Sequence, residues 1–180
     1  MTGVNLDEEF YQGQNFWKQS PSMKMRDYEL NDSIIEQAEA LLSVKLPPSL
    51  IRLLKIQNGG ELEYPYFQLP VIDEDGSRFE RQERFPSIDP IHFRKDDLSL
   101  LSSQELLAGS GLADERLIVL WTDFHFWVVL DYREHSADPA VLYIAEDFEA
   151  STYDRTEWEY SRLAGSFDEF LAKLYRIKGR

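Results

Sequence analysis

Apolar residues recur at helical spacing in two adjacent stretches of the chain. The first follows Asn31 or Asp32, either of which can cap a helix start, and its apolar stripe is Ile34, Ile35, Ala38, Leu41 and Leu42. The second opens with two prolines, which suit a first helical turn, and repeats Leu50, Leu53 and Leu54. We predict two amphipathic helices with buried stripes, joined by Val44-Lys45-Leu46-Pro47 and closed by Asn58-Gly59-Gly60.

After Gly60 the pattern changes to short apolar runs separated by turn residues. The runs 66–72 and 77–85 flank Asp73-Glu74-Asp75-Gly76 and predict a β-hairpin. Three further runs, at 117–121, 126–132 and 141–145, predict an antiparallel meander. The middle run is apolar on both alternating faces, so we expect it to be a central strand.

Capping patterns frame two more helices. Ser102 and Glu105 have capping-box spacing before a short helix, and Ser166 and Glu169 have the same spacing before a closing helix. The closing helix carries Phe167, Phe170, Leu171 and Leu174. Near the N-terminus, a further predicted helix docks its aromatic residues on the domain; its apolar residues are Leu6, Phe10, Phe16 and Trp17.

Helices first, strands next and a helix last describe a single α+β domain, with helices against one side of an antiparallel-rich sheet. A length of 180 residues encloses one substantial core without requiring a second domain. We divide the chain into an N-terminal arm or helix packed on the domain, residues 1–26, and the domain itself, residues 27–180.

The two-helix cassette "IIEQAEALLSVKLPPSLIRLLKIQNGG" resembles the opening motif of the SUKH superfamily, the Smi/Knr-type domains of fungal cell-wall regulators and bacterial immunity proteins. The stretches "FWVVLDYR", "PAVLYIAEDF" and "SFDEFLAKLY" are similar to later strands and the closing helix of that family. The resemblance spans roughly residues 27–175 and implies a SUKH-like fold. The motif residues that it implies are Leu46, Pro47, Asn58, Gly59, Gly60, Trp127, Leu130, Asp131 and Tyr132. The turn Asp123-Phe124-His125 departs from the family because it lacks the usual glycines.

Charge narrows the class of partner. A formal net charge of −14 argues against nucleic acid or an anionic membrane, because basic residues drive phosphate binding. A basic protein partner fits better, although acidity also serves simply to keep a protein soluble. The chain has no cysteine, which excludes disulfides and thiolate metal sites and suits a reducing compartment. It also shows neither a signal-peptide pattern nor a run long enough to cross a bilayer, so we expect a cytoplasmic protein.

Catalytic motifs are missing from the sequence. The acidic turn at 73–76 has Arg84 where a calcium loop needs its last acidic ligand, and the three histidines fit no zinc motif. Nucleophile-elbow and phosphate-loop patterns are also missing. Asp131 and Glu146 can in principle act as an acid/base pair, but among 33 acidic residues such pairs arise by chance. We predict a protein that is not an enzyme and uses no metal or cofactor.

The stretch from Asp131 to Glu159 combines nine acidic residues with only two basic ones and is interleaved with aromatic residues. Such a mixture supplies steering charge and anchors for a basic partner. The predicted partner-binding residues are Asp131, Glu146, Asp147, Phe148, Glu149, Tyr153, Asp154, Glu157 and Trp158. Core aromatics beside a hydrated loop are the alternative interpretation.

The family resemblance implies a bacterial immunity protein that binds a cognate toxin and blocks its active site or substrate path. If the toxin is a nuclease or deaminase, its basic groove would attract an acidic inhibitor. The alternative is an intracellular regulatory or scaffold module unrelated to toxins. A hydrolase using a carboxylate pair is the least supported hypothesis.

Overall fold

In the computed structural model, which describes residues 7–19, 28–112, 114 and 116–179, the cassette forms the two predicted helices. α1 spans Asp32–Leu42 and α2 spans Pro48–Ile56. Asn31 caps α1, because its side-chain oxygen accepts a hydrogen bond from the Ile34 N–H at 3.0 Å. The predicted stripe of α1 is wrong at one position, since Leu41 is 64% exposed. The buried face of α1 is instead centred on Ile35, Ala38 and Glu39, which leaves Leu41 at its edge.

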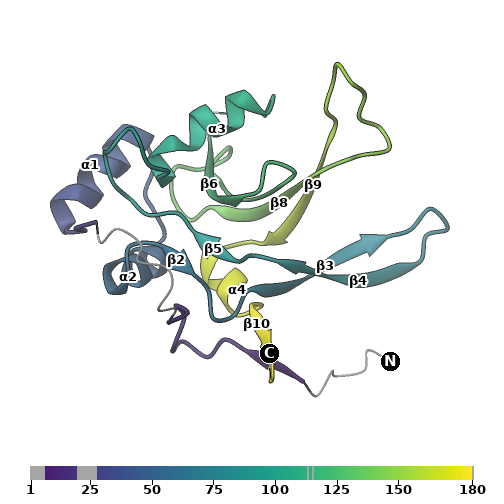
Figure 1. Cartoon of the computed structure of the whole chain (residues 1–180), viewed down its shortest axis with the longest axis horizontal. Helices are drawn as coiled ribbons and strands as arrows, with labels where there is room; N and C mark the ends of the chain where they lie inside the picture. Colours follow the sequence, from purple (N-terminus) through teal and green to yellow (C-terminus); the bar gives the residue numbers. More distant parts are fainter. Residues whose placement is uncertain (1–6, 20–27, 113, 115, 180) are drawn as a thin grey trace.

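Three antiparallel sheets follow (Figure 1). The first has the order β1-β10-β3-β4, with β1 Glu8–Phe10, β10 Tyr175–Ile177, β3 Tyr66–Ile72 and β4 Arg78–Arg84. The second pairs β2 Gly60–Glu61 with β5 Ser87–Ile88. The third is a meander of β6 Leu117–Thr122, β7 Phe126–Asp131, β8 Ala140–Glu146 and β9 Trp158–Ala164. The hairpin, the meander and the central position of β7 are therefore confirmed.

The strand β7 separates two cores. Val128, Leu130 and Tyr132 belong to the larger core, which also holds apolar residues of α1, α2 and α4 (Phe167–Leu171). Trp127 and Val129, on the other face, belong to a smaller core under α3 (Ser103–Gly109). Helices therefore cover both faces of the meander, rather than the one side that the element order suggested.

Several local predictions differ from the structure. Residues 7–19 contain strand β1 instead of a helix, and Leu6 lies outside the described residues. Phe16 and Trp17 are nevertheless buried, and the Trp17 indole N–H donates to the Leu53 carbonyl at 2.9 Å. The expected cap at Ser102 is absent: Ser99 caps the 3-10 helix Leu100–Ser102 that precedes α3. α4 is capped by Ser166 as predicted, but it ends early and Tyr175 joins β10.

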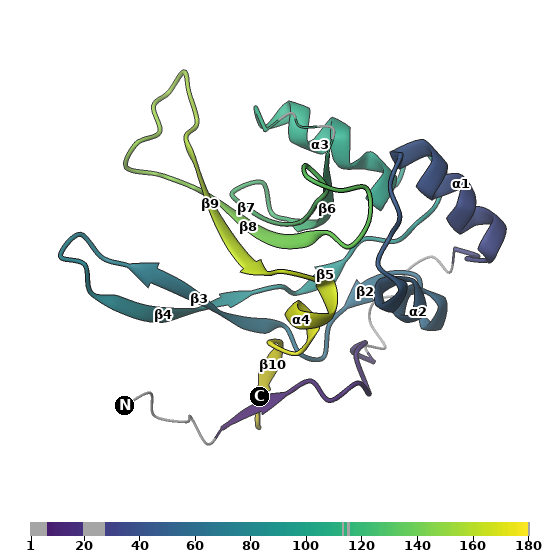
Figure 2. The same ribbon diagram turned by 180° about the vertical axis from the view of Figure 1, so that it is seen from behind.

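Two long connections project from one side of the molecule, away from α1 and α2 (Figures 1 and 2). They are the β3–β4 hairpin and the loop that joins β8 to β9. No helix among the described residues is long and apolar enough to cross a membrane.

Candidate partner-binding surface

Antiparallel pairing brings the β6–β7 turn and the β8–β9 loop to the same end of the meander. Phe126 faces Ala145 across the β7–β8 ladder, and the Glu146 N–H donates to the His125 carbonyl at 2.9 Å. Residues 123–125 and 146–157 are therefore neighbours. We call this set the acidic–aromatic surface.

Internal hydrogen bonds shape the β8–β9 loop. The Asp147 carboxylate accepts the backbone N–H groups of Glu149 and Ala150, both at 3.0 Å. The Asp147 N–H in turn donates to the Glu157 carbonyl at 2.9 Å, and the Glu157 N–H donates to the Ser151 hydroxyl at 2.9 Å. The loop is thus an ordered surface feature whose polar backbone is largely satisfied within itself.

Three aromatic rings on this surface face solvent. Phe124 is 55% exposed, Phe148 is 61% exposed and Tyr153 is fully exposed. The Phe148 ring lies 5.6 Å from the His125 ring, measured between centroids. Large exposed rings are typical anchors of protein–protein contacts, because docking a partner removes their apolar area from water.

The surface keeps a negative charge after its own ion pairs are considered. Glu146 contacts His125, with Oε2 2.6 Å from Nδ1, and Glu157 contacts Arg155, with Oε1 2.6 Å from Nε. Within the described parts of the chain, Glu149 and Asp154 form no ion pair, and both side chains are exposed. On this surface the charges of these two carboxylates are therefore not compensated by a neighbouring cation among the described residues.

Hydrogen bonds hold the glycine-free turn at Phe124 in place. Phe124 has a φ of +74°, a conformation that L-residues with large side chains rarely adopt. Its N–H donates to the Thr122 hydroxyl at 2.8 Å, and the Asp123 carboxylate accepts the N–H groups of His125 and Phe126 at 3.0 and 2.8 Å. These bonds hold a strained residue with its ring outward, an arrangement often found at binding sites.

Asp131 lies apart from the other predicted site residues. It faces Ala140 at the opposite end of the β7–β8 ladder, about 20 Å along the strand from Glu146. The Arg133 guanidinium binds both of its carboxylate oxygens, at 2.8 and 2.9 Å. Burial alone would raise the pKa of Asp131, but these hydrogen bonds outweigh it and leave the pKa below its usual value. The separation also removes the acid/base geometry considered for Asp131 and Glu146.

Trp158 lies at the end of the β8–β9 loop, where β9 begins. It is partly buried and packs edge-on against Trp127, with ring centroids 6.3 Å apart. Both indole N–H groups are buried and have no acceptor among the described residues. Trp158 therefore packs against the smaller core at the base of the loop.

The motif residues hold the fold together. Asn58 donates to the Ile91 carbonyl and accepts its N–H, at 2.8 and 2.9 Å. Gly59 has a φ of +90°, and a Cβ there would lie 2.8 Å from the Pro90 nitrogen. Leu46, Pro47, Gly60, Trp127, Leu130 and Tyr132 are all buried. The Tyr132 hydroxyl also donates to the Lys45 carbonyl at 2.8 Å, which ties the end of β7 to the helix connection.

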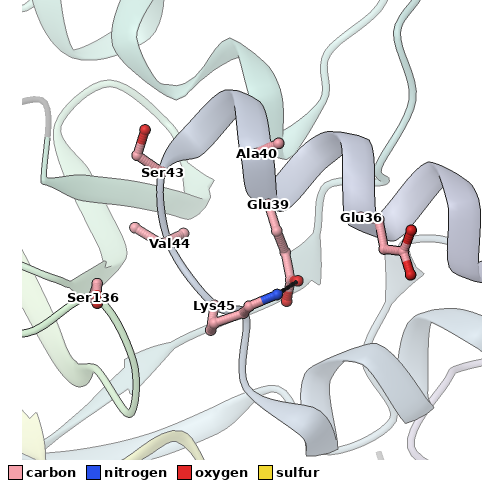
Figure 3. A pocket seen from close by; sticks show the side chains of 7 residues that line it. All are labelled: Glu36, Glu39, Ala40, Ser43, Val44, Lys45 and Ser136. Atoms are coloured by element: carbon pink, nitrogen blue, oxygen red, sulfur yellow. Dashed lines mark hydrogen bonds and ion pairs between the residues drawn. The ribbon is translucent and has the colours of Figure 1, made fainter.

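Sequence reasoning missed Glu39. Its buried carboxylate accepts a hydrogen bond from the Leu46 N–H at 3.0 Å. It also accepts one from the Lys45 ammonium at 2.8 Å, which Figure 3 shows. Two shallow pockets of about 330 and 550 Å³ lie beside this ion pair. Within the described residues, no group of three or more histidine or acidic side chains could hold a metal ion. The pair thus orders the α1–α2 connection. Glu39 could have been found from the sequence, because it is an acidic residue on the predicted buried face of α1.

Comparison with protein families gives one match. The model of the SMI1 / KNR4 family (SUKH-1) matches residues 29–173. Searches of curated proteins and of solved structures give no match. The matched segment includes α1, α2 and the whole meander, while β1 and β10 lie outside it.

Proposed function

Because the chain belongs to the SMI1 / KNR4 family (SUKH-1), we propose that it is a non-catalytic protein-binding domain whose partner docks on the acidic–aromatic surface. The observation that carries the proposal is the placement of three exposed rings beside the unpaired carboxylates of Glu149 and Asp154. Rings supply contact area, and carboxylates supply attraction for arginine and lysine.

The partner that suits this surface is a basic protein. A net charge of −14 steers such a partner toward the domain and repels nucleic acid. We propose that the chain is a bacterial immunity protein that covers the basic substrate groove of a cognate toxin, such as a nuclease or deaminase. Inhibition would then result from occupancy, with no chemistry performed on the toxin.

Charge reversal tests the surface directly. The variant Glu149→Lys/Asp154→Lys alters exposed side chains without touching Asp147, whose carboxylate holds the loop turn. Binding to the toxin encoded beside the gene is measured by stopped-flow association at low and moderate salt. We expect the association rate to fall at least tenfold and the salt dependence to become shallower, because long-range attraction is lost.

A matched control separates local from global charge. Glu36→Lys/Glu134→Lys makes the same change in net charge at two exposed residues away from the surface. If the control variant slows association as much as the loop variant does, the partner does not bind at the acidic–aromatic surface. Failure of any adjacent-gene toxin to bind would instead favour a regulatory module with a different basic partner, and turnover of a small molecule would contradict a non-catalytic role.

A further inference from the structure

Asn58 and Gly59 form the one asparagine–glycine pair in the chain. Asparagine is a chemically labile residue, because a backbone nitrogen that follows it can attack the Cγ carbon of its side chain. A glycine in the next position favours this attack, since no side chain crowds its nitrogen and its backbone turns freely. In an unfolded chain, Asn58 is therefore the asparagine most prone to lose its side-chain nitrogen.

The reaction at this pair needs water and no other reactant. The Gly59 nitrogen bonds to the Asn58 Cγ carbon, and the side-chain nitrogen leaves as ammonia with the proton of the Gly59 amide. The cyclic succinimide that results is opened by water at one of its two carbonyl carbons. Opening at one carbon gives aspartate, and opening at the other gives isoaspartate, which adds a methylene group to the main chain.

The fold holds the Asn58 carboxamide away from this reaction. Asn58 is 8% exposed, and both the nitrogen and the oxygen of its side chain are bonded to backbone. The side-chain nitrogen donates to the Ile91 carbonyl at 2.8 Å and to the Tyr28 carbonyl at 3.2 Å. The side-chain oxygen accepts the Ile91 N–H at 2.9 Å. Ring closure requires the carboxamide to leave these three bonds and turn toward Gly59.

The attacking nitrogen is also held in place. The Gly59 N–H donates to the Gln57 carbonyl at 2.9 Å. The Gly59 backbone lies against Pro90, so closely that a Cβ on Gly59 would be 2.8 Å from the Pro90 nitrogen. Loss of the amide proton and rotation of the main chain are both opposed by these contacts. The pair is therefore protected as long as the segment around Pro90 stays packed on it.

The fold requires both members of this labile pair. Gly59 has a φ of +90° and no room for a side chain, so another residue there is strained. Asn58 must donate to carbonyl groups and accept from an N–H at the same time, which a carboxamide does and a carboxylate does not. After deamidation, a buried charge would face the carbonyl oxygens of Ile91 and Tyr28 with no proton to donate.

We propose that Asn58 is a deamidation site that is protected in the folded chain and becomes reactive on unfolding, so that time spent unfolded opposes the return to the native fold. Both products lack the donors that the Ile91 and Tyr28 carbonyls require, and isoaspartate also lengthens the chain next to Gly59. The site lies in the α2–β2 connection and needs no partner, so the proposal does not depend on the proposed function.

Site-resolved mass spectrometry of the natural chain tests the protection. The chain is kept in mildly alkaline buffer with and without concentrated urea, and deamidation is followed at each asparagine. Asn15 and Asn31 are internal controls, because both are exposed in the fold and neither precedes a glycine. In urea we expect Asn58 to react at least tenfold faster than either control. Without urea it should react at least tenfold more slowly than in urea and no faster than the controls.

Gly59→Ala tests the chemistry in urea, where the effect of this substitution on folding does not matter. The added methyl group crowds the attacking nitrogen, so Asn58 should deamidate at least tenfold more slowly than in the natural chain.

A second unfolding experiment tests the consequence for the fold. Natural chains kept in alkaline urea are returned to native buffer and unfolded again with urea. The deamidated chains should have an unfolding equilibrium constant at least tenfold larger than that of fresh chains. Chains kept equally long in mildly acidic urea, where the Gly59 nitrogen holds its proton, should match fresh chains. Asn58→Asp, made directly, should show the same tenfold loss without any incubation.

Three results would each overturn the proposal. The first is deamidation of Asn58 that is as fast in native buffer as in urea. The second is a Gly59→Ala chain that is as labile in urea as the natural chain. The third is a deamidated chain that refolds to the stability of fresh chains.

Discussion

Phe124 has a φ of +74° and an exposed ring, so its backbone cost to the fold can be measured separately from its proposed contact with a partner. Left-handed backbone costs an L-residue about 1–2 kcal/mol, and glycine avoids this cost. We expect Phe124→Gly to be about 1 kcal/mol more stable than Phe124→Ala in urea unfolding. Both variants should bind the partner more weakly than the natural chain. Equal stability of the two variants would show that the turn relaxes when the ring is removed.

Asp89 gives the fold a defined pH response. Burial raises the pKa of this carboxyl to about 6, above its ordinary value. The folded chain therefore binds more protons than the unfolded chain between about pH 4 and 6, and the contribution of Asp89 to stability falls as pH rises through that window. Above about pH 7 Asp89 is ionised, and the folded state bears the full free-energy cost of burying its charge.

The variant Asp89→Asn isolates this contribution. We expect it to be about 1–3 kcal/mol more stable than the natural chain at pH 8, with a much smaller difference at pH 4. Urea unfolding of both proteins at the two pH values measures the difference directly. A difference that stays constant with pH would mean that the amide acts by packing or hydrogen bonding instead.

Among the elements, apolar periodicity predicted those that bury a regular face. The two helices of the cassette, the β3–β4 hairpin and β6 to β8 all carry such a pattern. Strand β9 was missed because much of it is a half-exposed edge that mixes aromatic and polar residues. The three-residue strands β1 and β10 have no local signal, since each exists only through pairing with a distant strand.

Only part of the candidate surface could be located from the sequence. Composition located the β8–β9 loop, because charged and aromatic residues cluster there. Asp131 was grouped with that loop because it is near in sequence, but the course of β7 and β8 carries it to the opposite end of the sheet. Phe124 belongs to the surface because of its positive φ in the β6–β7 turn. The sequence of that turn contains no glycine, so it gave no indication of this conformation.

At the scale of the whole molecule, Phe16 and Trp17 make the described part of the N-terminal arm a contributor to the larger core. Phe16 and Trp17 are 3% and 5% exposed and pack with residues of α1, α2 and β7. We expect Trp17→Ala to lower the free energy of unfolding by about 3–5 kcal/mol while a single transition is kept. Phe10→Ala, at a position 41% exposed, should cost much less. A separate early transition would show that the arm unfolds independently of residues 27–180.

The edge-on pair of Trp127 and Trp158 gives this chain a native fluorescence reporter. Trp158 sits directly at the foot of the β8–β9 loop, and its indole contacts a fully enclosed one. Any molecule that clamps or shifts the loop must alter the surroundings of Trp158, so emission intensity should respond to docking without an added dye. Trp158→Phe would silence that response and thereby identify its source.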